Sequence, residues 1–144
     1  MQEYIHFFQH NAVLSILWLT ILIALASLFF KSASSGIHLV SVSEMVQLIN
    51  KENGIVVDVR SSHEFNQGHI VNSLHILPSD IQKDSFHGIE KFKSNPVVVV
   101  CRTGQTAQSS ATALVKAGFD RVSVLRHGLM AWEKANLMLL CGEK

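Results

Sequence analysis

The run Pro96-Val97-Val98-Val99-Val100 is the feature that most constrains the fold of this chain. Four consecutive valines lack the alternation of a half-buried strand, so both faces of this strand must be covered, as in a parallel sheet between helices. The segment Cys101-Arg102-Thr103-Gly104-Gln105-Thr106 follows, and a helical pattern begins near its end. We therefore expect Cys101 to lie between a buried strand and the N-terminus of a helix.

This position favours a reactive cysteine. Free backbone N–H groups and the positive end of the helix dipole stabilise negative charge, and hence a thiolate nucleophile. For the residue taken alone, an inert cysteine that fills space at the end of the strand is the alternative.

Composition excludes several classes of function. The 144 residues carry a formal net charge of +1, and no basic run is interleaved with aromatic residues, so no nucleic-acid partner is expected. Two cysteines, Cys101 and Cys141, do not make a disulfide framework. Neither a CxxC pair, a metal-binding histidine spacing nor a phosphate-binding glycine motif occurs, so we expect no metal and no cofactor.

A segment at 12–30 contains no Asp, Glu, Lys, Arg or His. Because about 20 apolar residues cross a bilayer, we predict a flank at 1–11, a transmembrane helix at 12–30, a linker at 31–36 and a domain at 37–144. A cleaved signal peptide, cut near Ser32-Ala33-Ser34, is the alternative, but the segment is long and no Lys or Arg precedes it. Lys31 and Lys51 follow it, so the positive-inside rule places the domain in the cytoplasm.

Apolar runs and helical patterns alternate along the domain. Strands are expected at 37–40, 55–59, 73–77, 96–100 and 121–125. Helices are expected after Ser41, with Glu44 completing a capping box, after Ser61 or Ser62, after Ser79, at 86–95, from near 106 to 118, and at 130–135. This order predicts an α/β sandwich with a largely parallel sheet, whose ligands bind at the carboxyl ends of the strands. Cys101 and the segment 58–61 should share that edge.

Three motifs stand in order along the domain. The first is Val57-Asp58-Val59-Arg60 with Glu64, Gly68-His69-Ile70, Ser73 and Pro78; the second is the Cys101 segment; the third is Arg126-His127-Gly128 with Ala131-Trp132. Together they resemble the rhodanese family, sulfurtransferases that carry sulfane sulfur on a cysteine. His127 stands where a glycine is more usual. With its anchor, the chain looks like a bacterial single-pass rhodanese of the inner membrane.

The resemblance implies a three-layer sandwich and a mechanism in which Cys101 becomes a persulfide. It implies a small anionic donor such as thiosulfate, or a protein persulfide, and a thiophilic acceptor; a membrane-protein partner would explain the anchor. Donor binding falls to the backbone of 102–106 and to the side chains of Arg102, Thr103, Gln105, Thr106 and Arg60, with Gly104 shaping the loop. Asp58 and His69 take structural roles near the site. Arg102 as a solvated surface residue, Arg60 as a structural one and Thr106 as a mere helix cap are the alternatives.

Other functions remain open at this point. The domain could be a membrane-tethered binding module with little catalytic activity. A phosphatase is disfavoured because the sixth residue after Cys101 is Ala107 and not the arginine of a Cys-x5-Arg loop. A redox sensor would oxidise Cys101 to a sulfenic acid, with Cys141, otherwise a spectator, as the resolving thiol.

Overall fold

The computed structural model describes residues 12–33, 37–86 and 88–142. The chain divides into two compact units, Met1–Ser35 and Gly36–Lys144, which we describe separately. The predicted flank at 1–11 and the second half of the predicted linker lie outside the described residues.

The described part of the first unit is one helix, α2 (Ala12–Ala33). Its apolar side chains are largely exposed, Val13 at 82% and Trp18 at 66%. Among the described residues, no helix reaches the combination of length and hydropathy required to cross a bilayer. The transmembrane helix at 12–30 therefore stays a prediction from the sequence.

The second unit is built on a five-stranded sheet with the order β1-β5-β4-β2-β3. The strands are β1 (Ile37–Val40), β2 (Ile55–Asp58), β3 (Leu74–His75), β4 (Pro96–Val100) and β5 (Arg121–Leu125). Every neighbouring pair is parallel, as predicted. The third strand has only two residues of the five expected.

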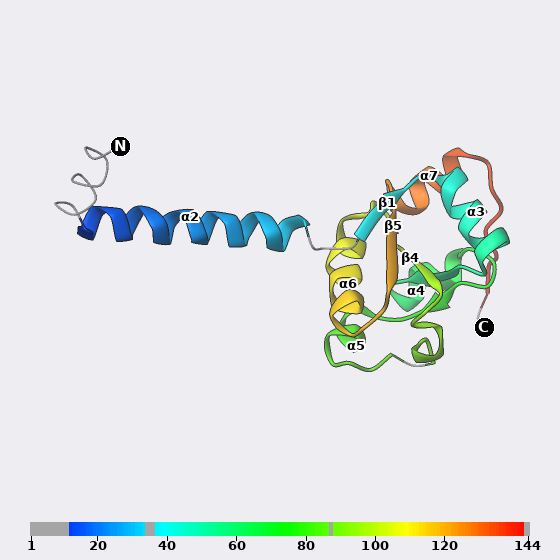
Figure 1. Cartoon of the computed structure of the whole chain (residues 1–144). Helices are drawn as coiled ribbons and strands as arrows, with labels where there is room; N and C mark the ends of the chain where they lie inside the picture. The colour runs from blue at the N-terminus through cyan, green and yellow to red at the C-terminus, as the bar shows by residue number, and fades with distance from the viewer. Residues whose placement is uncertain (1–11, 34–36, 87, 143–144) are drawn as a thin grey trace. The chain divides into compact units, whose positions relative to one another are not determined.

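The four valines of β4 build the core on both faces of the sheet, and each is fully buried. Val97 and Val99 pack in the cluster formed with α5 (Pro78–Gln82) and α6 (Gln105–Lys116). Val98 and Val100 pack in the cluster formed with α3 (Val42–Glu52) and α7 (Gly128–Lys134). Figure 1 shows α5 and α6 on one side of the sheet and α3 and α7 on the other, so the three-layer sandwich is confirmed.

Two helices begin with the same local device. Ser41 caps α3 and Ser61 caps α4 (Ser62–Gln67), and in each the glutamate three residues on bonds back to the cap. In both boxes the serine hydroxyl accepts from a backbone N–H that has no partner within the helix. The predicted box at Ser41 is confirmed, and Ser61, not Ser62, is the cap of α4.

Two predicted helix starts were wrong. Ser79 lies inside α5, whose N-cap is Leu77, because Pro78 fits the first helical position. The helix predicted from near 106 is α6, whose N-cap is Gly104, so the alternative reading of Thr106 as a mere helix cap is wrong. The last helix begins at Gly128, two residues before its predicted start, because His127 adopts the left-handed conformation (φ 61°) that precedes the helix.

The helix expected at 86–95 is a single 3₁₀ turn, η1 (Glu90–Phe92). Gly88 has a φ of 89°, which is incompatible with a helix running through this segment. The segment is nevertheless packed, because Phe86 and Ile89 are buried in the core on the α6 side.

Candidate active site

Cys101 lies where β4 ends, at the carboxyl edge of the sheet. Its side chain is nearly buried, with the residue 4% exposed. The backbone N–H of Gly104 donates a hydrogen bond to Sγ at 2.9 Å. This bond turns the loop around the sulfur, so a backbone donor meets any negative charge that develops there.

The loop that begins at Cys101 is hydrogen-bonded to the N-terminus of α7. The N–H groups of Leu129 and Met130 donate to the carbonyl oxygens of Cys101 and Arg102, at 2.9 and 3.3 Å. Because each peptide unit is planar and trans, the N–H groups on the other side of those two peptides point away from α7. The helix start thereby sets the orientation of the peptide planes that follow Cys101.

Gly128 makes this close approach possible. A Cβ on Gly128 would lie 2.2 Å from the carbonyl oxygen of Cys101, and its φ of 57° is also one that side chains disfavour. Gly104, at a φ of 99°, packs on the same turn, and its Cβ would lie 3.4 Å from the carbonyl oxygen of Leu125. The second and third sequence motifs are therefore one interlocked structure.

A cavity of about 310 Å³ opens beside Cys101. Two segments line it, one following β2 and one following β4, which are neighbours in the sheet. Five predicted site residues contribute to the lining: Arg60, Cys101, Arg102, Thr103 and Thr106. Gly104 acts through its backbone, and Gln105 is not part of the lining.

Three further residues line this cavity and were not predicted as site residues: Val59, Ser61 and Glu64. Their position after β2 was the available signal, because the carboxyl end of β2 meets that of β4. The pKa of Glu64 lies below its ordinary value, chiefly because the Ser61 hydroxyl bonds to the carboxylate, with the positive charges of Arg60 and Arg102 adding to the effect.

Asp58 and Arg60 form a buried ion pair beneath the cavity. The Arg60 Nη2 donates to the Asp58 Oδ2 at 2.7 Å, and the Nε donates to both carboxylate oxygens at 3.0 and 3.1 Å. Nη2 also donates to the carbonyl oxygen of Gly68 at 2.7 Å. The pair joins β2 to the end of α4 and so holds the wall of the cavity; a role for Arg60 in donor binding stays a prediction.

His69 lies away from the cavity lining. Its Nδ1 is 2.9 Å from the carbonyl oxygen of Phe65, and its ring stacks on that phenyl ring at 4.0 Å. Its backbone pairs with Leu140 through two bonds of 2.8 Å, which tie the C-terminal segment to α4. Nearby, the exposed Cys141 donates its thiol to the carbonyl oxygen of Gln67 at 3.1 Å.

The residues described by the structure include no group of three or more histidine, cysteine or carboxylate side chains placed to hold a metal ion. The Cys101 thiol, the backbone N–H of Gly104 and the cavity beside them are the features that the structure describes at this edge of the sheet.

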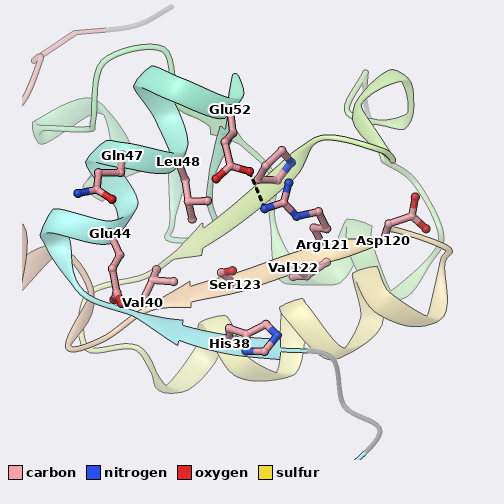
Figure 2. A pocket seen from close by; sticks show the side chains of 11 residues that line it. His38, Val40, Glu44, Gln47, Leu48, Glu52, Asp120, Arg121, Val122 and Ser123 are labelled. Atoms are coloured by element: carbon pink, nitrogen blue, oxygen red, sulfur yellow. Dashed lines mark ion pairs between the residues drawn. The ribbon is translucent and has the colours of Figure 1, made fainter.

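A second, larger cavity of about 480 Å³ lies between α3 and the strands β1 and β5. Figure 2 shows Glu52 of α3 reaching Arg121 of β5, and these two side chains form an exposed ion pair at 2.6 Å. Glu44, the capping glutamate of α3, lines the same cavity. No cysteine is among its lining residues, so it offers no counterpart to Cys101.

The domain is a parallel α/β sandwich with a cysteine loop at the carboxyl edge of its sheet. Comparison with a model of a known protein family agrees with this description. The model of the rhodanese-like domain matches residues 41–135, so the chain belongs to the rhodanese-like domain family. The match contains β2, the Cys101 loop and the turn before α7.

Relatives place the chain more closely. It is 41% identical over 143 residues to the uncharacterized protein YibN of Escherichia coli K12, covering 99% of this chain and all of YibN. It is 36% identical over 103 residues to the thiosulfate sulfurtransferase GlpE of Shewanella oneidensis, covering 72% of this chain and 98% of GlpE.

Solved structures agree on the fold. The Alr3790 protein of Anabaena superposes with a TM-score of 0.63 at 22% identity, covering 72% of this chain and 80% of that chain. The relatives and the family model together support a sulfurtransferase-type domain.

Proposed function

We propose that this protein is a sulfurtransferase that moves sulfane sulfur from a donor, thiosulfate or a persulfide on a protein, to a thiophilic acceptor through a persulfide on Cys101. The observation that carries the proposal is the bond from the Gly104 N–H to Sγ, made at the end of a cavity open to a small donor. The similarity of this domain to the thiosulfate sulfurtransferase GlpE of Shewanella oneidensis adds support to the proposal.

The reaction needs one nucleophile and no external oxidant or reductant. With thiosulfate, the Cys101 thiolate attacks the sulfane sulfur, the bond between the two sulfur atoms of the donor breaks, and sulfite leaves with the bonding electron pair. With a persulfide donor, the same attack on the outer sulfur releases a thiolate. An acceptor such as cyanide then attacks the outer sulfur of the Cys101 persulfide, which releases thiocyanate and restores the thiolate.

The chain's own groups have defined tasks in these steps. The Gly104 N–H stabilises negative charge on the cysteine sulfur before and after transfer. The turn before α7 keeps the loop closed around that sulfur. Arg102, Thr103 and Thr106, which line the cavity, are placed to contact the donor.

Intact-mass spectrometry of the reduced full-length chain after brief exposure to thiosulfate tests the proposal. The wild type and the Cys141→Ser control should gain one sulfur, about 32 Da per transfer, and lose it on addition of cyanide. Cys101→Ser should gain nothing. A sulfur that remains in Cys101→Ser, or absence of the adduct from the wild type with both thiosulfate and a persulfide donor, would contradict the proposal and favour the binding module.

We further propose that residues 12–30 attach the protein to the bacterial inner membrane, with the domain in the cytoplasm. The absence of charged residues from this segment and the exposed apolar side chains of α2 support this proposal. We expect the full-length chain to sediment with membranes after a carbonate wash. A chain that lacks residues 1–36 should stay in the supernatant. A full-length chain that stays in the supernatant would overturn it.

A further inference from the structure

The charges around the Cys101 cavity are balanced, which bears on which donor the cavity accepts. Three charged side chains line it, Arg60, Arg102 and Glu64. Beneath them the buried carboxylate of Asp58 binds the Arg60 guanidinium at 2.7 Å. Two cations thus face two carboxylates, and ionising Cys101 makes the total negative.

The two arginines are not equally free to meet an anion. Arg60 gives its Nε and Nη2 bonds to Asp58 and to the carbonyl oxygen of Gly68, and its side chain is 7% exposed. Arg102 is exposed beside the nucleophile. The positive charge that a donor meets at the cavity is therefore chiefly that of Arg102.

Glu64 opposes that charge. It is half-buried and lines the cavity, with its carboxylate fixed by the Ser61 hydroxyl at 2.9 Å. A carboxylate bound to a cap moves away from an entering anion only at the cost of that bond, because the helix start would then be without its reciprocal bond. Like charges at a partly buried site repel with less screening than in water.

We infer that Glu64 is a specificity-determining residue of the Cys101 cavity, which discriminates against dianionic donors such as thiosulfate and favours a sulfane sulfur on a carrier of lower negative charge. A persulfide on a zwitterionic or neutral thiol fits this class. The Cys101 thiolate attacks its outer sulfur, the sulfur–sulfur bond breaks, and the carrier thiolate leaves. This inference rests on the proposed function, but its charge selection can be measured without turnover.

The chain supplies a matched pair of variants. Glu64→Gln removes the charge and keeps a residue that completes a capping box, so α4 should still begin at the same place. Glu44→Gln makes the same change in the equivalent box of α3, where the serine and glutamate form the same bonds, but the glutamate lines the other cavity. A general effect of losing the charge of a capping glutamate should appear in both variants. An effect on the reactivity of Cys101 should appear in Glu64→Gln alone.

Alkylation of Cys101 in the full-length protein by iodoacetate and by iodoacetamide tests the charge selection directly. The two reagents perform the same substitution, but the first is an anion and the second is neutral. Mass spectrometry of the Cys101 peptide excludes reaction at the exposed Cys141. Glu64→Gln should raise the ratio of the iodoacetate rate to the iodoacetamide rate about threefold at low salt, and the gain should shrink at high salt.

Sulfur loading with two donors provides the second arm. For thiosulfate, a dianion, Glu64→Gln should raise the second-order loading rate about fivefold; for benzenethiosulfonate, a monoanion, about twofold. Glu44→Gln should match the wild type in both arms. An unchanged alkylation ratio in Glu64→Gln, or a change of the same size in Glu44→Gln, overturns the inference. A raised ratio in a protein that no donor loads with sulfur would uphold the charge selection and refute the proposed function.

Discussion

Two cavities of the domain are made from similar parts, yet of these two only the smaller is lined by a cysteine. Each is lined by the glutamate of a Ser-x-x-Glu capping box, and each has an arginine paired with a carboxylate. The cavity between α3 and the sheet is the larger, at about 480 Å³ against 310 Å³. Size and local motif therefore do not identify the site; the strand end that brings Cys101 into a cavity does.

The ion pairs show the difference in physical terms. Asp58 and Arg60 are 0% and 7% exposed in their side chains, whereas Glu52 and Arg121 are 44% and 54% exposed. A buried pair cannot lose one partner without leaving the other charged and desolvated, while water solvates the partner left over from an exposed pair. The wall of the Cys101 cavity thus depends on its ion pair far more than the other cavity does.

Asp58→Asn should have the largest effect on stability. Breaking the buried pair should cost about 3–5 kcal/mol in the free energy of unfolding, and Glu52→Gln at most about 1 kcal/mol. Urea unfolding of both variants and the wild type measures the contrast. Equal losses would mean that burial does not distinguish the two pairs.

Gly128→Ala should have the second-largest effect on stability, which urea unfolding also measures. The added Cβ would meet the backbone at 2.2 Å, so the loop at Cys101 must shift, while Gly118 also has a positive φ, 92° against 57°, but nothing near its Cβ. We expect Gly118→Ala to cost about 1 kcal/mol from backbone strain alone, and Gly128→Ala about 2 kcal/mol more from the displaced loop.

Sulfur loading separates the two glycine variants further. Gly128→Ala should load sulfur at least about tenfold more slowly than Gly118→Ala, since a loop shift of an ångström weakens catalysis at a preorganised site. Equal loading rates in two folded proteins would show that the contact between the loop and α7 does not position the nucleophile.

The smallest effect concerns acid stability, and here the two cavities should behave alike. The pKa of Glu44 is lowered, first by the backbone N–H of Ser41 and then by its hydroxyl, and that of Glu64 is lowered chiefly by the Ser61 hydroxyl. A carboxyl whose pKa is lower in the folded state stabilises the protein above its unfolded pKa, about 4.3 for glutamate, and loses that contribution as the pH falls through the folded value.

Both Glu44→Gln and Glu64→Gln should therefore lose less stability than the wild type between about pH 6 and pH 3, since they have one fewer such carboxyl. Chemical unfolding at several pH values measures this. A flatter pH dependence in one variant and not in the other would show that the two boxes are not energetically equivalent.

Much of the fold could be predicted because the signals were local. The buried strand follows from four adjacent valines, and the start of α3 follows from Ser41 and Glu44, three residues apart. Failures occurred where one residue overrode a pattern: Gly88 reduced an expected helix to one turn, and Pro78 moved a helix start ahead of Ser79.

The site was predictable in part. Cys101 and most residues of its loop line the cavity, as expected for the end of a central parallel strand. Glu64 had an evident local role as a cap, and its position after β2 was the one signal in the sequence that it could also line the cavity beside Cys101. Gly128 likewise lies 27 residues after Cys101 and belongs to another motif. Its close approach to the Cys101 carbonyl comes from tertiary packing, which the sequence does not show.

The sequence by itself determined which residues form strands and capped helices, that the sheet is parallel, and that a cysteine ends its central strand. These properties depend on neighbours within a few residues, through hydrophobic periodicity and hydrogen bonds near the chain's own backbone. Only the tertiary structure decided which capping glutamate lines the cavity beside Cys101, which ion pair is buried, and which helix start holds the loop. These features depend on contacts between segments that are distant in the sequence. There, the distance between two groups and the exclusion of water set the strength of their interaction.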